Sequence, residues 1–312
     1  MGPLIIRRLL VSLPALIGVL FLCFALLQIV PTDPAQIIAG PDARPEVVAE
    51  IRKELGLDRP IPVQFIEYIG RVAQGDLGRS IISNKSVSEE LADTIGPTAE
   101  LMIAAMVMAV PIGLLLGTLA AVRRGTAVDR IIMAISVAGV SMPVFFVGLL
   151  LIQYVGFHWG LLPFTGRTGA VWAGGLPSLI LPALTLASVL IGPVARLTRT
   201  AVLEVLGADF VRTARAKGLR ESVVVVHHAL RNALIPVVTL VGLQAAYLLG
   251  GAVVTETMFS WPGVGRLAVG AIISSDFPTA QGAIMILALA FLLINLIVDV
   301  LYVYLDPRVQ HA

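Results

Sequence analysis

Six long apolar segments constrain the fold of this chain more than any other feature of its 312 residues. A helix needs roughly 20 mostly apolar residues to cross the hydrocarbon core of a bilayer, and each segment supplies about that number. The segments span residues 9–30, 98–122, 131–157, 177–195, 233–254 and 283–305. We therefore predict an all-α polytopic membrane protein with six transmembrane helices.

The composition argues against the main soluble classes. Hydrophobic residues make up 57% of the chain and charged residues only 13%. Soluble domains are typically about 45–50% apolar and about 25% charged. Too few charged side chains are present to cover a water-facing surface, so a soluble enzyme, a nucleic-acid-binding protein and a disordered protein are all disfavoured. The single cysteine, Cys23, excludes an intrachain disulfide framework.

Basic residues in the short loops set the predicted orientation, because cytoplasmic loops carry an excess of lysine and arginine. With six spans, one side receives the two arginines before the first segment, the basic residues within 123–130 and 196–231, and Arg308. The short loops on the other side hold only Arg167 and Arg266. We therefore predict a cytoplasmic-membrane protein with both termini in the cytoplasm.

This topology divides the chain into four regions. They are a cytoplasmic N-terminus with the first transmembrane helix (1–30), an extracytoplasmic loop (31–97), a transmembrane core (98–305) and a cytoplasmic tail (306–312). A cytoplasmic loop at 198–232 interrupts the core. The loops at 31–97 and 198–232 are too long to serve only as connectors.

The outer loop contains a segment with helical periodicity at 45–57. Val47, Val48, Ile51 and Leu55 fall on one face, and charged residues occupy the other. The pattern predicts an amphipathic helix that lies on the outer face of the protein or on a partner.

The chain carries no recognisable catalytic motif. None of its three lysines, Lys53, Lys85 and Lys217, follows a glycine, so there is no phosphate-binding P-loop. The four histidines show no metal-ligand spacing. We therefore predict a protein that is not an enzyme, with no catalytic residue, no metal site and no cofactor of its own.

Polar residues inside the apolar segments are few, and they are costly to bury in lipid. Glu100 lies close enough to the boundary of its segment to be interfacial. Asp299 lies about one and a half turns from the inner end of the last segment, where a pathway role and pairing with a neighbouring arginine are equally open. A single membrane-centred carboxylate is weak support for an ion-coupled secondary transporter, which we keep as the alternative class.

The inner loop contains a short predicted helix. Asp209 is a candidate N-cap and Gly218 a candidate C′ residue, and they bracket about two helical turns from Phe210 to Lys217. So short a helix is unstable alone and needs a surface to dock on. Anionic lipid is one such surface; the small residues at the centre of the helix favour a protein partner instead.

The same loop resembles the cytoplasmic coupling loop of ATP-binding-cassette importer permeases. It is most similar to the form in dipeptide and oligopeptide permeases, with RTARAKGL at 212–219 and HALRNALIP at 228–236. The general family pattern is E-A-A-x-x-x-G, of which only Ala214 and Gly218 match here. Such departures are typical of the peptide branch.

The resemblance extends over nearly the whole chain. The start of the chain is similar to a B-type permease subunit, with two arginines, an anchor helix and the sequence PTDP. The matching fragments are PTDP at 31–34, ELGLD at 54–58, GDLGRS at 75–80, SMP at 141–143, TETMFSWPGVGR at 255–266 and DPR at 306–308.

The resemblance implies partners that the chain does not encode. A second homologous permease subunit would complete the translocation path, and two cytoplasmic ATPases would bind ATP and Mg. An extracytoplasmic substrate-binding protein would deliver the substrate, and no nucleic acid is involved. The implied location is the bacterial inner membrane, in contact with lipid.

The resemblance also implies roles for particular residues. The segments 31–97 and 255–277 would form outer contact and gating surfaces, with Glu256, Trp261 and Asp299 as pathway or gate candidates; an interfacial anchor is the other reading of Trp261. The residues that would couple the chain to the ATPase are Asp209, Phe210, Arg212, Ala214, Arg215, Lys217 and Gly218. The implied substrates are dipeptides or oligopeptides, with nickel, glutathione and oligosaccharides as alternatives.

Overall fold

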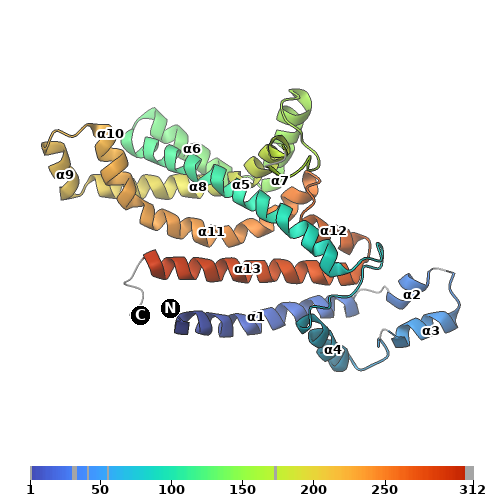
Figure 1. Ribbon diagram of the computed structural model, residues 1–312. Helices are drawn as coiled ribbons and strands as arrows, with labels where there is room; N and C mark the ends of the chain where they lie inside the picture. Colours follow the sequence, from blue (N-terminus) through green and yellow to red (C-terminus); the bar gives the residue numbers. More distant parts are fainter. Residues whose placement is uncertain (1, 30–33, 41, 55, 172–173, 306–312) are drawn as a thin grey trace. The chain divides into compact units, whose positions relative to one another are not determined.

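The computed structural model describes residues 2–29, 34–40, 42–54, 56–171 and 174–305. Every regular element in these ranges is a helix, apart from one isolated antiparallel bridge between Arg79 and Ser86 (Figure 1). The all-α class predicted from the sequence is therefore confirmed. The chain divides into two compact units. Unit one comprises Met1–Thr98 and Pro262–Leu293, and unit two comprises Ala99–Trp261 and Ile294–Ala312.

Unit one contains the N-terminal helices and the segment that follows residue 261. Its helices are α1 (Gly2–Ile29), α2 (Pro34–Ala39), α3 (Pro45–Glu54), α4 (Ile61–Ala73), α12 (Val264–Ile273) and the first parts of α5 (Val87–Val122) and α13 (Phe277–Leu305). The helix α3 confirms the helix predicted within 45–57. One apolar cluster joins Leu20 and Phe24 of α1 to Tyr68 of α4 and Met285. The helix α4 is thus held to α1 by buried apolar contact.

Unit two is organised around α8. Its helices are α6 (Ala127–Ser141), α7 (Val144–Leu150), η1 (Leu151–His158), α8 (Leu176–Leu206), α9 (Asp209–Ala216), α10 (Glu221–Val223), η3 (Val224–Leu230), α11 (Arg231–Met258) and the remaining parts of α5 and α13. The helix α8 packs against α6, α7 and α11. Buried side chains occur along most of its length, as expected for a helix in the centre of a bundle.

Glycines bring the backbones of α5, α6 and α8 into close contact. A Cβ atom at Gly117 of α5 would lie 2.4 Å from the carbonyl oxygen of Ala195, and one at Gly113 would lie 2.6 Å from a methyl group of Val194. A Cβ atom at Gly192 of α8 would lie 2.5 Å from the carbonyl oxygen of Ser136 in α6. Small residues four positions apart allow such approach between membrane helices, where close packing replaces the hydrophobic effect.

Four of the described helices are long and apolar enough to cross a membrane. They are Val87–Val122, Leu176–Leu206, Glu221–Met258 and Phe277–Val300. The pair Ala127–Ser141 and Val144–His158 makes a fifth if it is counted as one broken span. The predicted first span lies on α1, whose described apolar part is Pro14–Ala25. The count of six spans stays a prediction.

The predicted third span, which contains Pro143, forms two helices with a sharp bend between them. The two halves meet at an angle of 108°, with α6 ending at Ser141 and α7 starting at Val144. Pro143 lacks a backbone N–H, and its ring disfavours the helical conformation of the preceding residue. Met142 is accordingly extended, with φ −80° and ψ 129°. The proline that the sequence placed inside the span therefore ends one helix and begins the next.

Candidate functional site

The predicted coupling helix is present as α9, immediately after α8. The helix spans Asp209–Ala216, which confirms the expected two turns. The prediction that Asp209 is the N-cap is wrong. Ala208 holds the extended N-cap conformation, with φ −74° and ψ 150°, and Asp209 is the first helical residue. Its carboxylate still lies in the first turn, where negative charge interacts favourably with the helix dipole.

The predicted end of α9 at Gly218 is confirmed. Lys217 is the C-cap, and Gly218 follows in the left-handed region with φ +75°. The N–H of Gly218 donates to the carbonyl of Arg215 at 2.9 Å, and the N–H of Leu219 donates to that of Ala214 at 3.4 Å. These two bonds form a Schellman motif, for which glycine is preferred because it lacks a Cβ.

The helix α9 has a buried face and an exposed face. Val211 and Ala214 are buried and pack with Val224, against the end of α8 at Val205 and Leu206. Ala214 therefore belongs to the internal core of the hairpin formed by α9, α10 and η3 (Asp209–Leu230), which we call the coupling hairpin after its predicted role. The other six candidate coupling residues are exposed: Asp209, Phe210, Arg212, Arg215, Lys217 and Gly218.

Two ion pairs brace the exposed face of α9. Arg212 Nη1 lies 3.3 Å from Asp209 Oδ1 within the helix. Arg215 Nη2 and Nε donate to the two carboxylate oxygens of Glu221 at 2.7 and 3.2 Å, which links α9 to α10. This hydrogen bonding raises the pKa of Arg215. The hairpin thus presents basic side chains beside Phe210, which is 47% exposed.

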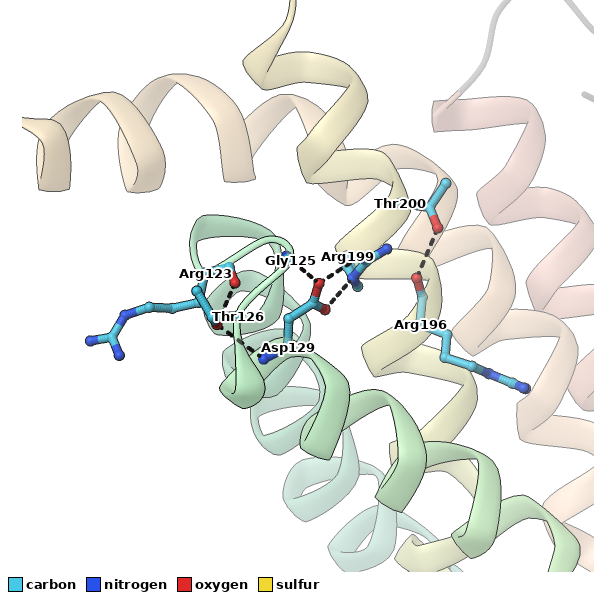
Figure 2. A network of polar contacts seen from close by, with 7 residues as sticks. All are labelled: Arg123, Gly125, Thr126, Asp129, Arg196, Arg199 and Thr200. Carbon is cyan, nitrogen blue, oxygen red and sulfur yellow. Dashed lines mark hydrogen bonds and ion pairs between the residues drawn. The ribbon is translucent and has the colours of Figure 1, made fainter.

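A third ion pair lies in unit two, between Arg199 and Asp129, and the sequence alone does not indicate it. Arg199 of α8 donates from Nε to Asp129 Oδ1 at 2.6 Å and from Nη2 to Asp129 Oδ2 at 2.8 Å (Figure 2). The N–H of Gly125 donates to the same carboxylate at 2.9 Å. The Asp129 side chain is only 4% exposed. We call Asp129 and Arg199 the inner pair, because both lie in or beside predicted cytoplasmic segments.

The turn before α6 is capped by its own side chains. Thr126 is the N-cap of α6 and accepts from the N–H of Asp129 at 3.5 Å, and its hydroxyl donates to the carbonyl of Arg123 at 2.6 Å (Figure 2). The spacing T-x-x-D at 126–129 is a helix-start signal that sequence reasoning could have used. It would have located the turn but not the partner of Asp129.

Another polar arrangement joins Glu100 of α5 to the loop before α8. Glu100 Oε2 accepts a hydrogen bond from Arg167 Nε at 2.9 Å and lies 2.7 Å from Arg167 Nη2, and its Oε1 accepts from the N–H of Val171 at 2.9 Å. The guanidinium carbon of Arg167 lies 5.8 Å from the centre of the Trp261 ring. Gly166 donates to the carbonyl of Phe259 at 2.7 Å.

The gate candidates Glu256 and Trp261 lie together in this arrangement. Both side chains are fully buried, and the N–H of Trp261 donates to the carbonyl of Glu256 at 2.8 Å. We call Glu100, Arg167, Glu256 and Trp261 the outer network, because Arg167 lies in a predicted outer loop. The third candidate, Asp299, lies in the last third of α13 and is partly buried.

In unit one, parts of the two predicted outer surfaces pack together. Asp276 is buried and accepts hydrogen bonds from Ser80 Oγ at 2.5 Å, from the N–H of Ile81 at 3.1 Å and from Thr279 Oγ1 at 2.9 Å. A cavity of about 390 Å³ lies beside them, with Glu90 and Arg266 in its lining. The loop after α4 is thus fixed to the segment between α12 and α13.

Comparison with known proteins identifies the family. Residues 113–311 match the family described as binding-protein-dependent transport system inner membrane component, and residues 1–101 match its N-terminal region.

The chain is 45% identical over 307 residues to the glutathione transport system permease protein GsiC of Salmonella choleraesuis (strain SC-B67), with 98% of each chain covered. The same identity and coverage relate it to GsiC of Escherichia coli (strain K12). A chain from the crystal structure of an amino acid ABC transporter with histidines is similar at 13% identity and a TM-score of 0.47, covering 69% of this chain and 94% of that one. The chain therefore belongs to the inner membrane components of binding-protein-dependent transport systems, as a B-type permease subunit of the dipeptide, oligopeptide and nickel ATP-binding-cassette importers.

Proposed function

We propose that this permease subunit moves small peptides into the cytoplasm, with energy from partner ATPases. The observation that carries the proposal is the exposed face of α9, because a two-turn helix with arginines and an exposed phenylalanine suits docking in a groove on a protein. The buried face of α9 is attached to α8, so a displacement of α9 would be passed to a long membrane helix.

Glutathione is the second candidate substrate. The relatives at 45% identity are named for glutathione transport, and glutathione is itself a tripeptide. A peptide importer and a glutathione importer would therefore need similar recognition of amide and carboxylate groups. Nickel and oligosaccharides are the remaining alternatives within the family.

The proposed complex contains a second homologous permease subunit, two cytoplasmic ATPases and an extracytoplasmic substrate-binding protein. ATP and Mg belong to the ATPases, and this chain contributes transport without hydrolysis. Both chain termini and the 198–232 loop face the cytoplasm, whereas the 31–97 loop faces the binding protein. These roles follow from the family and from the predicted charge distribution of the loops.

The coupling surface comprises Asp209, Phe210, Arg212, Arg215, Lys217 and Gly218, with Ala214 fixing the helix from beneath. On the outer side, Glu256 and Trp261 would act as gate residues. Their support is that both are fully buried and that Trp261 lies against Arg167, whose pairing with Glu100 ties the loop before α8 to α5. Asp299 is proposed as a pathway residue on α13.

Reconstitution tests the proposal. The permease would be incorporated into lipid vesicles with its second permease subunit, its ATPases and the binding protein, and uptake of radiolabelled dialanine and radiolabelled glutathione would be measured. We expect ATP-dependent uptake of at least one of the two. Mass spectrometry of ligands retained by the purified binding protein would then identify the natural substrate.

Uptake by this chain alone, driven by an ion gradient without ATPases, would contradict the proposal and support a secondary transporter. ATP-dependent uptake of nickel or an oligosaccharide, with neither peptide taken up, would keep the importer and overturn the substrate class.

A further inference from the structure

We propose that the inner pair, Asp129 and Arg199, positions the α5–α6 turn on α8 so that a displacement of the coupling hairpin moves α6 together with α8. The proposal rests on the proposed docking of α9 on an ATPase. It assigns both residues a positioning role in energy coupling, without contact to substrate or nucleotide.

The geometry of the pair is that of a specific connection between two helices. Arg199 meets both carboxylate oxygens of Asp129, at 2.6 and 2.8 Å. Two parallel hydrogen bonds from a planar guanidinium fix orientation as well as distance. The Asp129 side chain is 4% exposed and that of Arg199 26% exposed, so water screens this pair far less than a surface pair.

Arg199 lies close to the coupling hairpin along one rigid helix. Seven positions separate it from Leu206, where α8 ends, and this corresponds to about 10 Å of helix. Between them, Ala201 and Val202 are buried in a cluster with Ala121 of α5, Ala229 and Ala233. Because α9 packs on Val205 and Leu206, this end of α8 and the hairpin form one packed body.

Asp129 connects that body to the α5–α6 turn. Its carboxylate also accepts from the N–H of Gly125, and its own N–H is capped by Thr126, so the turn and the first residues of α6 are fixed to the same side chain (Figure 2). Farther along, α6 also packs on α8, most closely where Gly192 meets Ser136 and Val140. The inner pair thus adds a directional polar connection at the first turn of α6 to apolar packing that is present on either side of it.

Arg196 offers a matched comparison on the same helix. It lies one turn before Arg199, is exposed, and its guanidinium points away from Asp129 in Figure 2. Replacing either arginine by glutamine removes one positive charge from α8 near the cytoplasm. Only Arg199→Gln removes the connection to α6.

The first test measures uptake per ATP hydrolysed in the reconstituted complex, with radiolabelled dialanine and radiolabelled glutathione as probes. For Asp129→Asn and Arg199→Gln we expect the ATPases to co-purify and to hydrolyse ATP, while uptake per ATP falls about tenfold, within the range of couplings between protein sites. Arg196→Gln should behave as wild type. Exchange of the two residues, Asp129→Arg with Arg199→Asp, should restore part of the loss.

The second test needs no substrate. Spin labels at Gly139→Cys on α6 and Thr213→Cys on α9, in a Cys23→Ser background, would report the α6–α9 distance with and without ATP. We expect one narrow distance distribution in both states for wild type and for Arg196→Gln. In the Asp129→Asn and Arg199→Gln variants, the α6–α9 distance distribution should become broader when ATP is bound.

Unchanged uptake per ATP in Asp129→Asn and Arg199→Gln, or unchanged distance distributions, would overturn the positioning role. Failure of both variants to assemble with the ATPases would also overturn it, because the pair would then be needed only for folding. If the wild-type complex takes up neither probe, the substrate class proposed above fails, and the distance measurement alone decides the positioning role.

Discussion

The inner pair and the outer network both join an arginine to a carboxylate, but they connect different kinds of structure. In the inner pair, Asp129 lies in the first turn of α6 and Arg199 lies on α8, so two helices are joined directly. In the outer network, Glu100 on α5 meets Arg167 in an irregular segment, and Arg167 lies over the ring of Trp261. The helix-to-helix connection suits transmission of a displacement, and the loop-to-helix connection suits a closure that can open.

The difference also appears in what surrounds each arginine. The position of Arg199 is fixed by the Asp129 carboxylate and by α8, the helix that carries it. Arg167 lies in an irregular segment, and its position is fixed by the Glu100 carboxylate, the Trp261 ring and the adjacent hydrogen bond from Gly166 to Phe259. Since backbone segments without regular hydrogen bonding open at lower free energy than helices, the outer network is the part that we expect to rearrange first.

The largest expected effect comes from removing the aromatic part of the outer network. Trp261 is fully buried, so Trp261→Ala should lower the free energy of unfolding by about 3–5 kcal/mol through lost burial and a residual cavity. Thermal unfolding of the purified complex in detergent would measure it. The control is Trp159→Ala, where the side chain is 60% exposed and the loss should be small. Equal losses in the two variants would show that Trp261 does not anchor the network.

The next largest loss of stability is expected from disturbing the packing of α5 against α8, which involves neither the inner pair nor the Glu100–Arg167 pair. Gly117→Leu places a side chain against the carbonyl of Ala195, and we expect a loss of about 3 kcal/mol because the backbones must move apart. Gly139→Leu is the matched control, since a Cβ atom there meets nothing within 4 Å. Thermal unfolding of both variants would compare them. A Gly117→Leu protein as stable as Gly139→Leu would contradict the close packing.

A smaller effect tests whether the outer loop depends on its carboxylate. Glu100→Gln should destabilise the protein by about 2 kcal/mol, because charge-assisted hydrogen bonds to Arg167 and Val171 are weakened. It should also accelerate trypsin cleavage after Arg167. Glu67→Gln is the control, because Glu67 pairs with Arg59 at an exposed position. Cleavage at the same rate in both variants would mean that Glu100 does not hold the loop.

The smallest effect on stability is expected at Gly218, together with a clear effect on coupling. Gly218→Leu should cost about 1 kcal/mol, because a residue with a Cβ is strained at φ +75° although the surrounding space is open. ATP hydrolysis should become uncoupled from uptake while membrane insertion is retained. Gly75→Leu, at φ +79° and also in open space, should have the same local cost and normal coupling. Normal uptake by Gly218→Leu in vesicles would exclude a docking role for this turn.

Several features could be predicted from the sequence because their cause is local. The helix α9 and its end at Gly218 follow from residues adjacent in the chain, as does the helix within 45–57. The N-cap of α9 was placed one residue late, since Asp209 fits the cap preference but the helical turn already includes it. Local preference therefore located the ends of α9 to within one residue and the end of α3, at Glu54 rather than Leu57, to within three.

The pairs could not be predicted, because their partners are far apart in the chain. Asp129 and Arg199 are 70 positions apart, and Glu100 and Arg167 are 67. Each of these residues alone is typical of a loop or a helix end. A motif in the sequence indicates Glu256 and Trp261 as candidates, but their burial, and the contact of Trp261 with Arg167, depend on how the loop before α8 meets the end of α11.

The sequence by itself determined the all-α class, the family and the position of α9. Apolar length, turn chemistry and ordered motifs are properties of contiguous residues, and they survive without knowledge of packing. Only the tertiary structure decided that the helix bends sharply at Pro143, that Ala214 faces inward, and that two arginines meet their carboxylates. These features depend on which segments face each other, as do the close contacts that glycines allow between α5, α6 and α8.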